Sequence, residues 1–173
     1  MRWAPQVLLP LLMLLAAGPA NSQTGSAALP DGPAPGGSVE LFHYEDEGAL
    51  TAFAFHLSRL QHNGLGLEVG LGMFPEYLQE RALVMTPDVG VGYNISLPGV
   101  TFLLRGGAGA IAALGQGSPQ FFPGIHLGGG ALIQLDKRVA LRADLLKRWY
   151  VLPEGTEPFW SLGVGFSVLA GGR

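Results

Sequence analysis

Three residues with the identities of a hydrolytic triad lie close together in the chain. His56 and Ser58 are separated only by Leu57, and Glu68 follows in the next apolar segment. In an extended strand, the side-chain period of two places His56 and Ser58 on one face. A serine activated by a histidine that a carboxylate orients is an arrangement used for acyl transfer. A hydrolase is therefore one hypothesis, although no nucleophile elbow and no evident oxyanion donors accompany these residues.

Two other features resemble a cofactor or metal site in residue type but lack the context that such a site needs. Segment 107–112, Gly-Ala-Gly-Ala-Ile-Ala, resembles a dinucleotide fingerprint, but such a site needs a βαβ unit and an acid about 20 residues later. Here the flanks are strand-like and the next acid is Asp136. His43, His62 and His126 fall on different segments without the spacing of metal ligands. We expect no cofactor and no metal site.

A second group of side chains is important for its charge and not as nucleophiles. An isolated charge inside a protein is very costly, so charges on a buried face must pair with one another. Three arginines and three carboxylates alternate with apolar residues, although a Gly-Ala repeat leaves the facing of Arg105 open. We expect these six residues to form an interior polar network, which holds the fold together rather than conducting ions: Glu68, Asp88, Arg105, Arg142, Asp144 and Arg148.

Segment 64–73, Gly-Leu-Gly-Leu-Glu-Val-Gly-Leu-Gly-Met, shows which kind of element carries these residues. Every second residue is large and apolar, and the residues between are glycine plus Glu68. Glycine weakens a strand of a soluble sheet without any compensating gain. Small and charged side chains do suit the inside of a narrow closed barrel whose outside meets lipid.

Similar segments recur along the chain from Ser38 onward. Most are close to the length of about 9–11 residues that a tilted strand needs to cross a bilayer. We therefore predict an all-β fold, an eight-stranded antiparallel up-and-down transmembrane β-barrel. Its strands are expected at roughly 38–44, 50–60, 64–74, 83–95, 99–111, 122–135, 138–150 and 158–169.

The expected connections alternate between short and long. Short turns follow the second, fourth and sixth strands, and the long connections are 45–49, 75–82, 112–121 and 151–157. Short turns at one end and longer loops at the other are typical of outer-membrane barrels. Aromatic residues gather near the long connections, where we expect a girdle at the membrane interface. These residues are Phe42, Tyr44, Phe74, Tyr77, Phe121, Phe122, Trp149, Tyr150, Phe159 and Trp160.

The ends and the composition define the domains. Arg2 and the apolar run 7–16 indicate a signal peptide over residues 1–22, cleaved after Ala20 or Ser22. We expect a disordered leader over 23–37, rich in Pro, Gly, Ala and Ser, and a barrel over 38–173.

The composition excludes several other classes of protein. The mean hydropathy is +0.32 with 13% charged residues, yet no apolar run after residue 22 approaches the length of a transmembrane helix. A net charge of −3 argues against nucleic-acid binding, which needs a basic surface. The absence of cysteine excludes a disulfide framework.

The signal segment, the alternating strands and the closing strand 159–169 together resemble the small outer-membrane β-barrel proteins of the OmpA-transmembrane-domain and OmpX type. This resemblance implies a place in a Gram-negative outer membrane. It also implies contact with outer-membrane lipid and lipopolysaccharide, insertion by the barrel-assembly machinery, and a monomer. A soluble lipocalin-like barrel is the rival fold, and it would need apolar residues inside and polar residues outside.

The function expected for such a barrel is a structural or surface-interaction role with a plugged interior. One alternative is a narrow channel for small solutes. The other is an envelope lipid-modifying hydrolase, because outer-membrane lipid A deacylases resemble this chain in having a His-x-Ser pair and a glutamate on a barrel wall. Their site opens towards lipid, where we expect Phe53, Phe55 and Leu57 here.

The expected outer loops are acidic. Their only run of three consecutive acids is Glu45, Asp46 and Glu47. The ordinary role of these charges is to keep an exposed end soluble. A sharper hypothesis is that they meet divalent cations of the lipopolysaccharide layer, or a basic partner.

Overall fold

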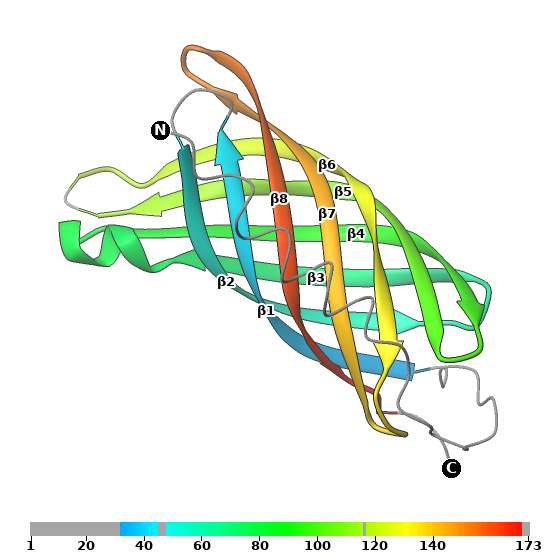
Figure 1. Cartoon of the computed structure of the whole chain (residues 1–173). Helices are drawn as coiled ribbons and strands as arrows, with labels where there is room; N and C mark the ends of the chain where they lie inside the picture. Colours follow the sequence, from blue (N-terminus) through cyan, green and yellow to red (C-terminus); the bar gives the residue numbers. More distant parts are fainter. Residues whose placement is uncertain (1–31, 45–47, 116, 171–173) are drawn as a thin grey trace.

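The structure, a computed structural model, describes residues 32–44, 48–115 and 117–170. Figure 1 shows a closed barrel of tilted strands with one short helix at the end of a hairpin. The strands are β1 (Gly32–Tyr44), β2 (Gly48–Leu60), β3 (Leu65–Phe74), β4 (Leu83–Leu97), β5 (Val100–Leu114), β6 (Gln120–Gln134), β7 (Val139–Leu152) and β8 (Gly155–Val168), and the 3-10 helix η1 is Pro75–Glu80.

The predicted topology is confirmed. Each strand pairs antiparallel with the next in the chain, and β8 pairs with β1 to close the barrel. In the closing pair, Val39 lies opposite Val164. Closure pairs every strand on both sides over most of its length, which largely removes the exposed edges through which strands aggregate.

Side chains alternate between the two faces of the wall as the sequence pattern predicts. Leu67 and Val69 are 58% and 57% exposed, whereas His56 and Ser58 of the adjoining strand are 8% and 4% exposed. The apolar face is therefore the outside and the small and polar face is the inside. A soluble lipocalin-like barrel has the opposite arrangement. No helix among the described residues has the length and apolarity needed to cross a membrane.

The start of β1 corrects the predicted leader. We expected disorder through Gly37, but β1 begins at Gly32, and only the rest of the leader lies outside the described residues. The first residues of β1 pair with β2 alone, because pairing with β8 begins at Gly36. Pro33 and Pro35 are tolerated there, since a strand with one neighbour does not need every backbone N–H.

The connection between β7 and β8 is also shorter than predicted. We expected a loop over 151–157, but pairing continues through Val151 opposite Thr156 and Leu152 opposite Gly155. Gly155 has φ +145°, a value that side chains rarely allow, and this lets the hairpin turn tightly. The connection at 75–82 does hold a longer segment, the helix η1. The predicted long connections 45–49 and 112–121 are also shortened, because β2 begins at Gly48, β5 ends at Leu114 and β6 begins at Gln120.

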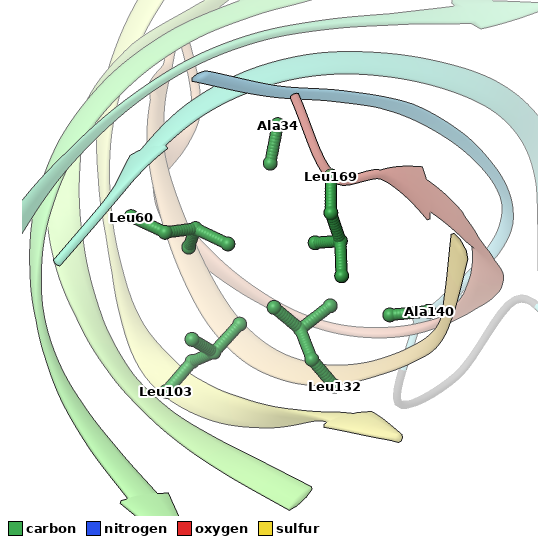
Figure 2. Packing of buried hydrophobic residues seen from close by; sticks show 6 residues of the cluster. All are labelled: Ala34, Leu60, Leu103, Leu132, Ala140 and Leu169. Carbon is green, nitrogen blue, oxygen red and sulfur yellow. The ribbon is translucent and has the colours of Figure 1, made fainter. Parts of the chain in front are cut away.

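The interior is filled in three layers. An apolar layer lies near the end where β1 begins and β8 ends, beside the turns 61–64, 98–99 and 135–138, and we call this the short-turn end. Figure 2 shows its six residues converging: Ala34, Leu60, Leu103, Leu132, Ala140 and Leu169. A second apolar layer near the opposite end, the loop end, contains Phe42, Ala52 and Phe74, packed against Leu50, Tyr77 and Val84. Polar and charged residues occupy the space between the two apolar layers.

The aromatic girdle is only partly as predicted. Trp160 and Phe121 lie on the outside at 40% and 64% exposure, whereas Phe42 and Phe74 are buried in the loop-end layer with ring centroids 4.9 Å apart. Tyr150 is buried as well. Proximity to a loop indicates how far along the barrel axis a residue lies. Whether the residue faces inward or outward depends on its place in the two-residue alternation of the strand.

Close packing of the wall depends on glycine at a few positions. A Cβ added at Gly165 of β8 would lie 2.0 Å from the carbonyl oxygen of Gly37 in β1. No real Cβ approaches another atom so closely, so this part of the closing seam requires glycine.

Candidate functional site

The charged residues of the interior come from strands spread around the barrel. Glu68 lies on β3, Asp88 on β4 and Arg105 on β5, while β7 supplies Arg142, Asp144 and Arg148 at alternate positions. The period of two in each strand directs all six side chains inward. The structure joins them in two clusters of ion pairs.

The first cluster is centred on Arg142, which is 2% exposed. Its Nε donates to Asp144 Oδ2 at 2.6 Å, and its Nη2 donates to Glu68 Oε2 at 2.7 Å. Arg105 contacts the same two carboxylates, through Nη1 to Glu68 and through Nη2 to Asp144 at 2.6 Å. Two positive and two negative groups therefore alternate in a compact quartet.

This quartet connects opposite sides of the barrel. In the closed order of eight strands, β3 and β7 are equally far apart in both directions, so the Arg142–Glu68 pair spans the lumen. Arg142 Nη1 also donates to Ser58 Oγ on β2 at 3.1 Å. Arg142 therefore has an acceptor at Nε, Nη1 and Nη2, whereas the buried Nε of Arg105 has no hydrogen-bond partner among the described residues. A buried charge that is paired in this way resists separation from its partners.

The second cluster surrounds Arg148. Its Nη1 lies 3.3 Å from Asp88 Oδ2 and its Nη2 lies 3.3 Å from Glu40 Oε2. The Nε donates to Ser161 Oγ at 3.1 Å, and the guanidinium lies 5.2 Å from the Phe42 ring centroid. Every nitrogen of this guanidinium thus faces an acceptor, and its face meets an aromatic ring.

Glu40 is the interior charge that sequence reasoning missed. The sequence predicts only a short first strand, over 38–44. The available signal was the alternation of Ser38, Glu40 and Phe42, all of which face inward in β1. With Glu40 included, four carboxylates face three guanidinium groups in the described interior.

The residues of the suspected hydrolytic triad do not form one. Ser58 Oγ donates to Glu68 and accepts from Arg142 Nη1, so its hydroxyl belongs to the ion-pair cluster. The Nε2 atom of His56 lies 3.1 Å from Ser167 Oγ, on the far side of Gly36. The expected sharing of a face by His56 and Ser58 is correct, but the histidine engages a different serine.

The interior leaves little free space. The cavity within the charged layer, between the two clusters, measures about 20 Å³. The cavity in the loop-end aromatic layer measures about 80 Å³ and is lined by residues such as Phe42, Phe74 and Tyr150. A volume of 20 Å³ is enough for about one water molecule.

The remaining predicted features of the outer end are only partly within the described residues. Glu45, Asp46 and Glu47 lie outside them. Glu76, at the start of η1, accepts a hydrogen bond from the Thr51 backbone at 3.0 Å and so fastens the helix to β2. Within ranges 32–44, 48–115 and 117–170, no three His, Asp, Glu or Cys residues are placed to hold a metal ion.

Comparisons with known proteins give structural likenesses only. No protein-family model matches the sequence, and no curated protein matches it. Neisserial surface protein A superimposes with a TM-score of 0.56 at 14% identity, over 80% of this chain and 96% of that chain. The N-terminal β-barrel domain of Pseudomonas aeruginosa OprF gives 0.55 at 15% identity, over 80% and 98%. At this identity the likeness establishes the fold alone: the chain folds as the small eight-stranded barrels of bacterial outer membranes do.

Proposed function

We propose that this chain resides in a bacterial outer membrane as a closed barrel and acts through the surface that it presents there, in a structural or interaction role. The observation that carries this proposal is the filled interior, in which a paired charged layer lies between two apolar layers. A barrel of eight strands has an interior only wide enough for side chains.

The outer wall supports the membrane location. Along β7 the outward positions Val139, Leu141, Ala143 and Leu145 are apolar, and they are followed by Lys147. With a rise of about 3.4 Å per residue and a tilt of about 40°, the chain from Arg138 to Lys147 spans roughly 23 Å along the membrane normal. This is close to the apolar band of about 25 Å that outer-membrane barrels present to lipid.

The closed interior argues against the channel alternative. A hydrated ion needs a continuous aqueous path, whereas the charged layer holds a cavity of about 20 Å³ and both neighbouring layers are apolar. The arginines and carboxylates of the interior, which would otherwise attract ions, are engaged with each other. Their arrangement stabilises the barrel rather than guiding a solute.

Planar-bilayer recording tests both parts of this proposal. The full chain is refolded into phospholipid vesicles, insertion is checked by heat-dependent migration on a gel, and the vesicles are fused with a bilayer. We expect insertion with little or no steady conductance. Large, reproducible, ion-selective steps would contradict the closed interior and favour the narrow channel. Failure to insert would contradict the membrane location itself.

The hydrolase alternative receives no support from the geometry. Ser58 lies inside the barrel wall, and its hydroxyl contacts Glu68 and Arg142 instead of a histidine. The residues expected on the lipid face beside it, Phe55 and Leu57, do lie outside at 61% and 54% exposure. A lipid outside the barrel therefore cannot reach the hydroxyl of Ser58, and the function that we propose is not enzymatic.

Several parts of the proposal depend on sequence alone. Cleavage of residues 1–22 after Ala20 or Ser22 stays a prediction, and N-terminal sequencing of the mature protein tests it. The monomeric state and insertion by the barrel-assembly machinery are proposals from the barrel type. Contact of the acidic trio Glu45–Glu47 with divalent cations or lipopolysaccharide is likewise a proposal, and binding measurements on a variant test it.

A further inference from the structure

The cavity in the loop-end aromatic layer lies on the axis of the barrel, beyond the charged layer. It measures about 80 Å³, and its lining comes from seven of the eight strands and from η1. Three of the lining residues are aliphatic, Leu50, Val84 and Ile111. The other five are aromatic, and we call them the aromatic cage: Phe42, Phe74, Tyr77, Tyr150 and Phe159.

The rings of the aromatic cage stand at steep angles to one another. The planes of Phe42 and Phe74 meet at 66°, and those of Phe74 and Tyr77 meet at 87°. Tyr150 and Phe159 meet at 59° with their centroids 5.6 Å apart. Rings at such angles surround a space instead of stacking, and the face of each ring is electron-rich. The cage therefore offers negative π surface from several directions.

The cavity is closed at the charged layer and is reached from the loop end. Phe42 and Tyr150 are 2% and 3% exposed, whereas Leu50 and Tyr77 are only partly buried. The guanidinium of Arg148 lies 5.2 Å from the Phe42 ring centroid on the side of the charged layer. Glu40 and Asp88 pair with this guanidinium, so it does not present an uncompensated positive charge to the cavity.

The surface around the entrance is acidic. Segments 75–83, 112–115, 117–121 and 151–157 of the described chain contain four carboxylates and one guanidinium: Glu76, Glu80, Glu154, Glu157 and Arg81. A surface of one dominant sign raises the local concentration of ions of the opposite sign. The loop end therefore attracts cations towards the cage.

Size and hydrogen bonding restrict which cation the cage accepts. A water molecule needs about 10–15 Å³ of such space, so a cavity of about 80 Å³ has room for roughly five groups of that size. A trimethylammonium group, with one nitrogen and three methyl groups, fits this space. A primary ammonium ion would bring three N–H donors into a lining with few acceptors, which is costly. A quaternary ammonium has no N–H donor, and aromatic cages recognise such groups through cation–π contacts.

We infer that the aromatic cage is a binding site for a quaternary ammonium group of the choline type. The methyl groups contact the ring faces of Phe42, Phe74 and Phe159, and the rest of the ligand extends past Tyr77 towards the acidic loop end. This inference gives a ligand class to the interaction role proposed above, and it rests on that proposal for the exposure of the loop end to the medium.

The test titrates choline against the full chain refolded in octyl glucoside micelles, which contain no choline. Proton NMR of the choline methyl groups reports contact with aromatic rings as an upfield shift. Two analogues serve as controls on the unaltered chain: the neutral analogue with carbon in place of the nitrogen, and ethanolamine, a primary ammonium. Phosphatidylcholine in mixed micelles then distinguishes a lipid headgroup from a free solute as the source of the group.

We expect choline to bind with an upfield methyl shift, and both analogues to bind at least about tenfold more weakly. Phe159→Leu and Tyr77→Leu, which keep apolar volume but remove a ring, should each weaken choline binding about tenfold. Phe121→Leu is the matched control, because Phe121 lies at the same end but faces outward at 64% exposure. Added salt should weaken the binding by screening the acidic loop end. Competition by phosphatidylcholine extends the site to lipid headgroups, and its absence assigns the site to a soluble ligand.

Three results would overturn the inference: no binding of choline, binding of the neutral analogue as tight as that of choline, and an equal loss in Phe121→Leu. The second result would identify a purely apolar cavity. The first two use the unaltered chain, so they do not depend on whether a variant folds. A chain that inserts into vesicles yet shows any of these results refutes the quaternary ammonium site alone, whereas a chain that does not insert refutes the proposed function.

Discussion

Replacing Arg142 by methionine tests whether the charged layer holds the barrel together. Arg142 is 2% exposed and contacts Glu68, Asp144 and Ser58, which lie on three different strands. Methionine has a similar length but carries no charge and no donor. The variant therefore keeps most of the volume and removes the cation that spans the lumen.

The expected cost follows from what the variant leaves behind. Removing one partner of a buried ion pair typically costs about 3–5 kcal/mol, since the remaining charge is left without compensation. Arg105 still contacts both Glu68 and Asp144 in the variant, so these carboxylates keep one cation between them. We therefore expect a loss near the lower limit, about 3 kcal/mol in the free energy of unfolding.

A urea titration of refolding into phospholipid vesicles measures this loss, with the folded fraction read from gel migration. Arg138→Met is the matched control, because Arg138 is an exposed arginine in the turn directly before β7. Its cost should stay within about 0.5 kcal/mol. Adding Asp144→Asn to Arg142→Met removes one uncompensated carboxylate, so the double variant should recover part of the loss. A cost below about 1 kcal/mol for Arg142→Met, or an equal cost for Arg138→Met, would refute a structural role for the charged layer.

Three further predictions concern the wall, the closing seam and the loops. Leu67→Arg on the lipid face should cost about 2–4 kcal/mol in a vesicle-refolding titration if its level is near the midplane, and a neutral result in a chain that stays soluble without detergent would contradict the membrane location. Gly165→Ala should destabilise the barrel by about 1–3 kcal/mol in the same titration, because its Cβ would lie 2.0 Å from the Gly37 carbonyl oxygen, whereas Gly37→Ala meets its nearest atom at 3.6 Å and should be nearly neutral. Equal effects of the two alanines would refute the close-packing argument. Replacing the acidic trio Glu45–Glu47 by Gln-Asn-Gln should leave folding within about 0.5 kcal/mol and weaken calcium or lipopolysaccharide binding at low ionic strength; unchanged binding would show that the trio only solubilises its end.

The sequence pattern was sufficient to predict most of the fold, because the alternation of inward and outward side chains can be seen within each strand alone. Each of Arg142, Asp144 and Arg148 occupies an alternate position of one apolar strand, so a period of two determines their face without knowledge of the neighbours. The start of β1 at Gly32 was harder to predict, because the prolines and glycines of 32–37 show no alternation. Only the alternation of Ser38, Glu40 and Phe42 indicates that Glu40 faces inward, and it covers few residues. Composition indicated disorder there, but pairing with β2 determined the structure.

The pairing inside the barrel was not predictable in the same way. Which arginine meets which carboxylate depends on the stagger between strands around the whole barrel, and no local pattern encodes that quantity. His56 illustrates the difference. The predicted inward face of His56 is correct, but its partner is Ser167 of β8. The two side chains meet because Gly36, which lies between them, has no side chain. A triad inferred from neighbours in the sequence therefore fails against contacts that the register creates.

The arrangement of the ion pairs indicates what they add beyond the apolar layers. Adjacent strands are already joined by backbone hydrogen bonds, and the apolar layers at either end are non-directional. The pairs Arg142–Glu68 and Arg148–Asp88 instead connect strands that are not neighbours. Such pairs form only when the strand number and stagger bring these residues to one level, because a shifted register would leave charges buried without partners. We therefore expect the charged layer to select this barrel over misregistered ones, so that Arg142→Met yields a mixture of folded forms on a gel and not only a less stable barrel.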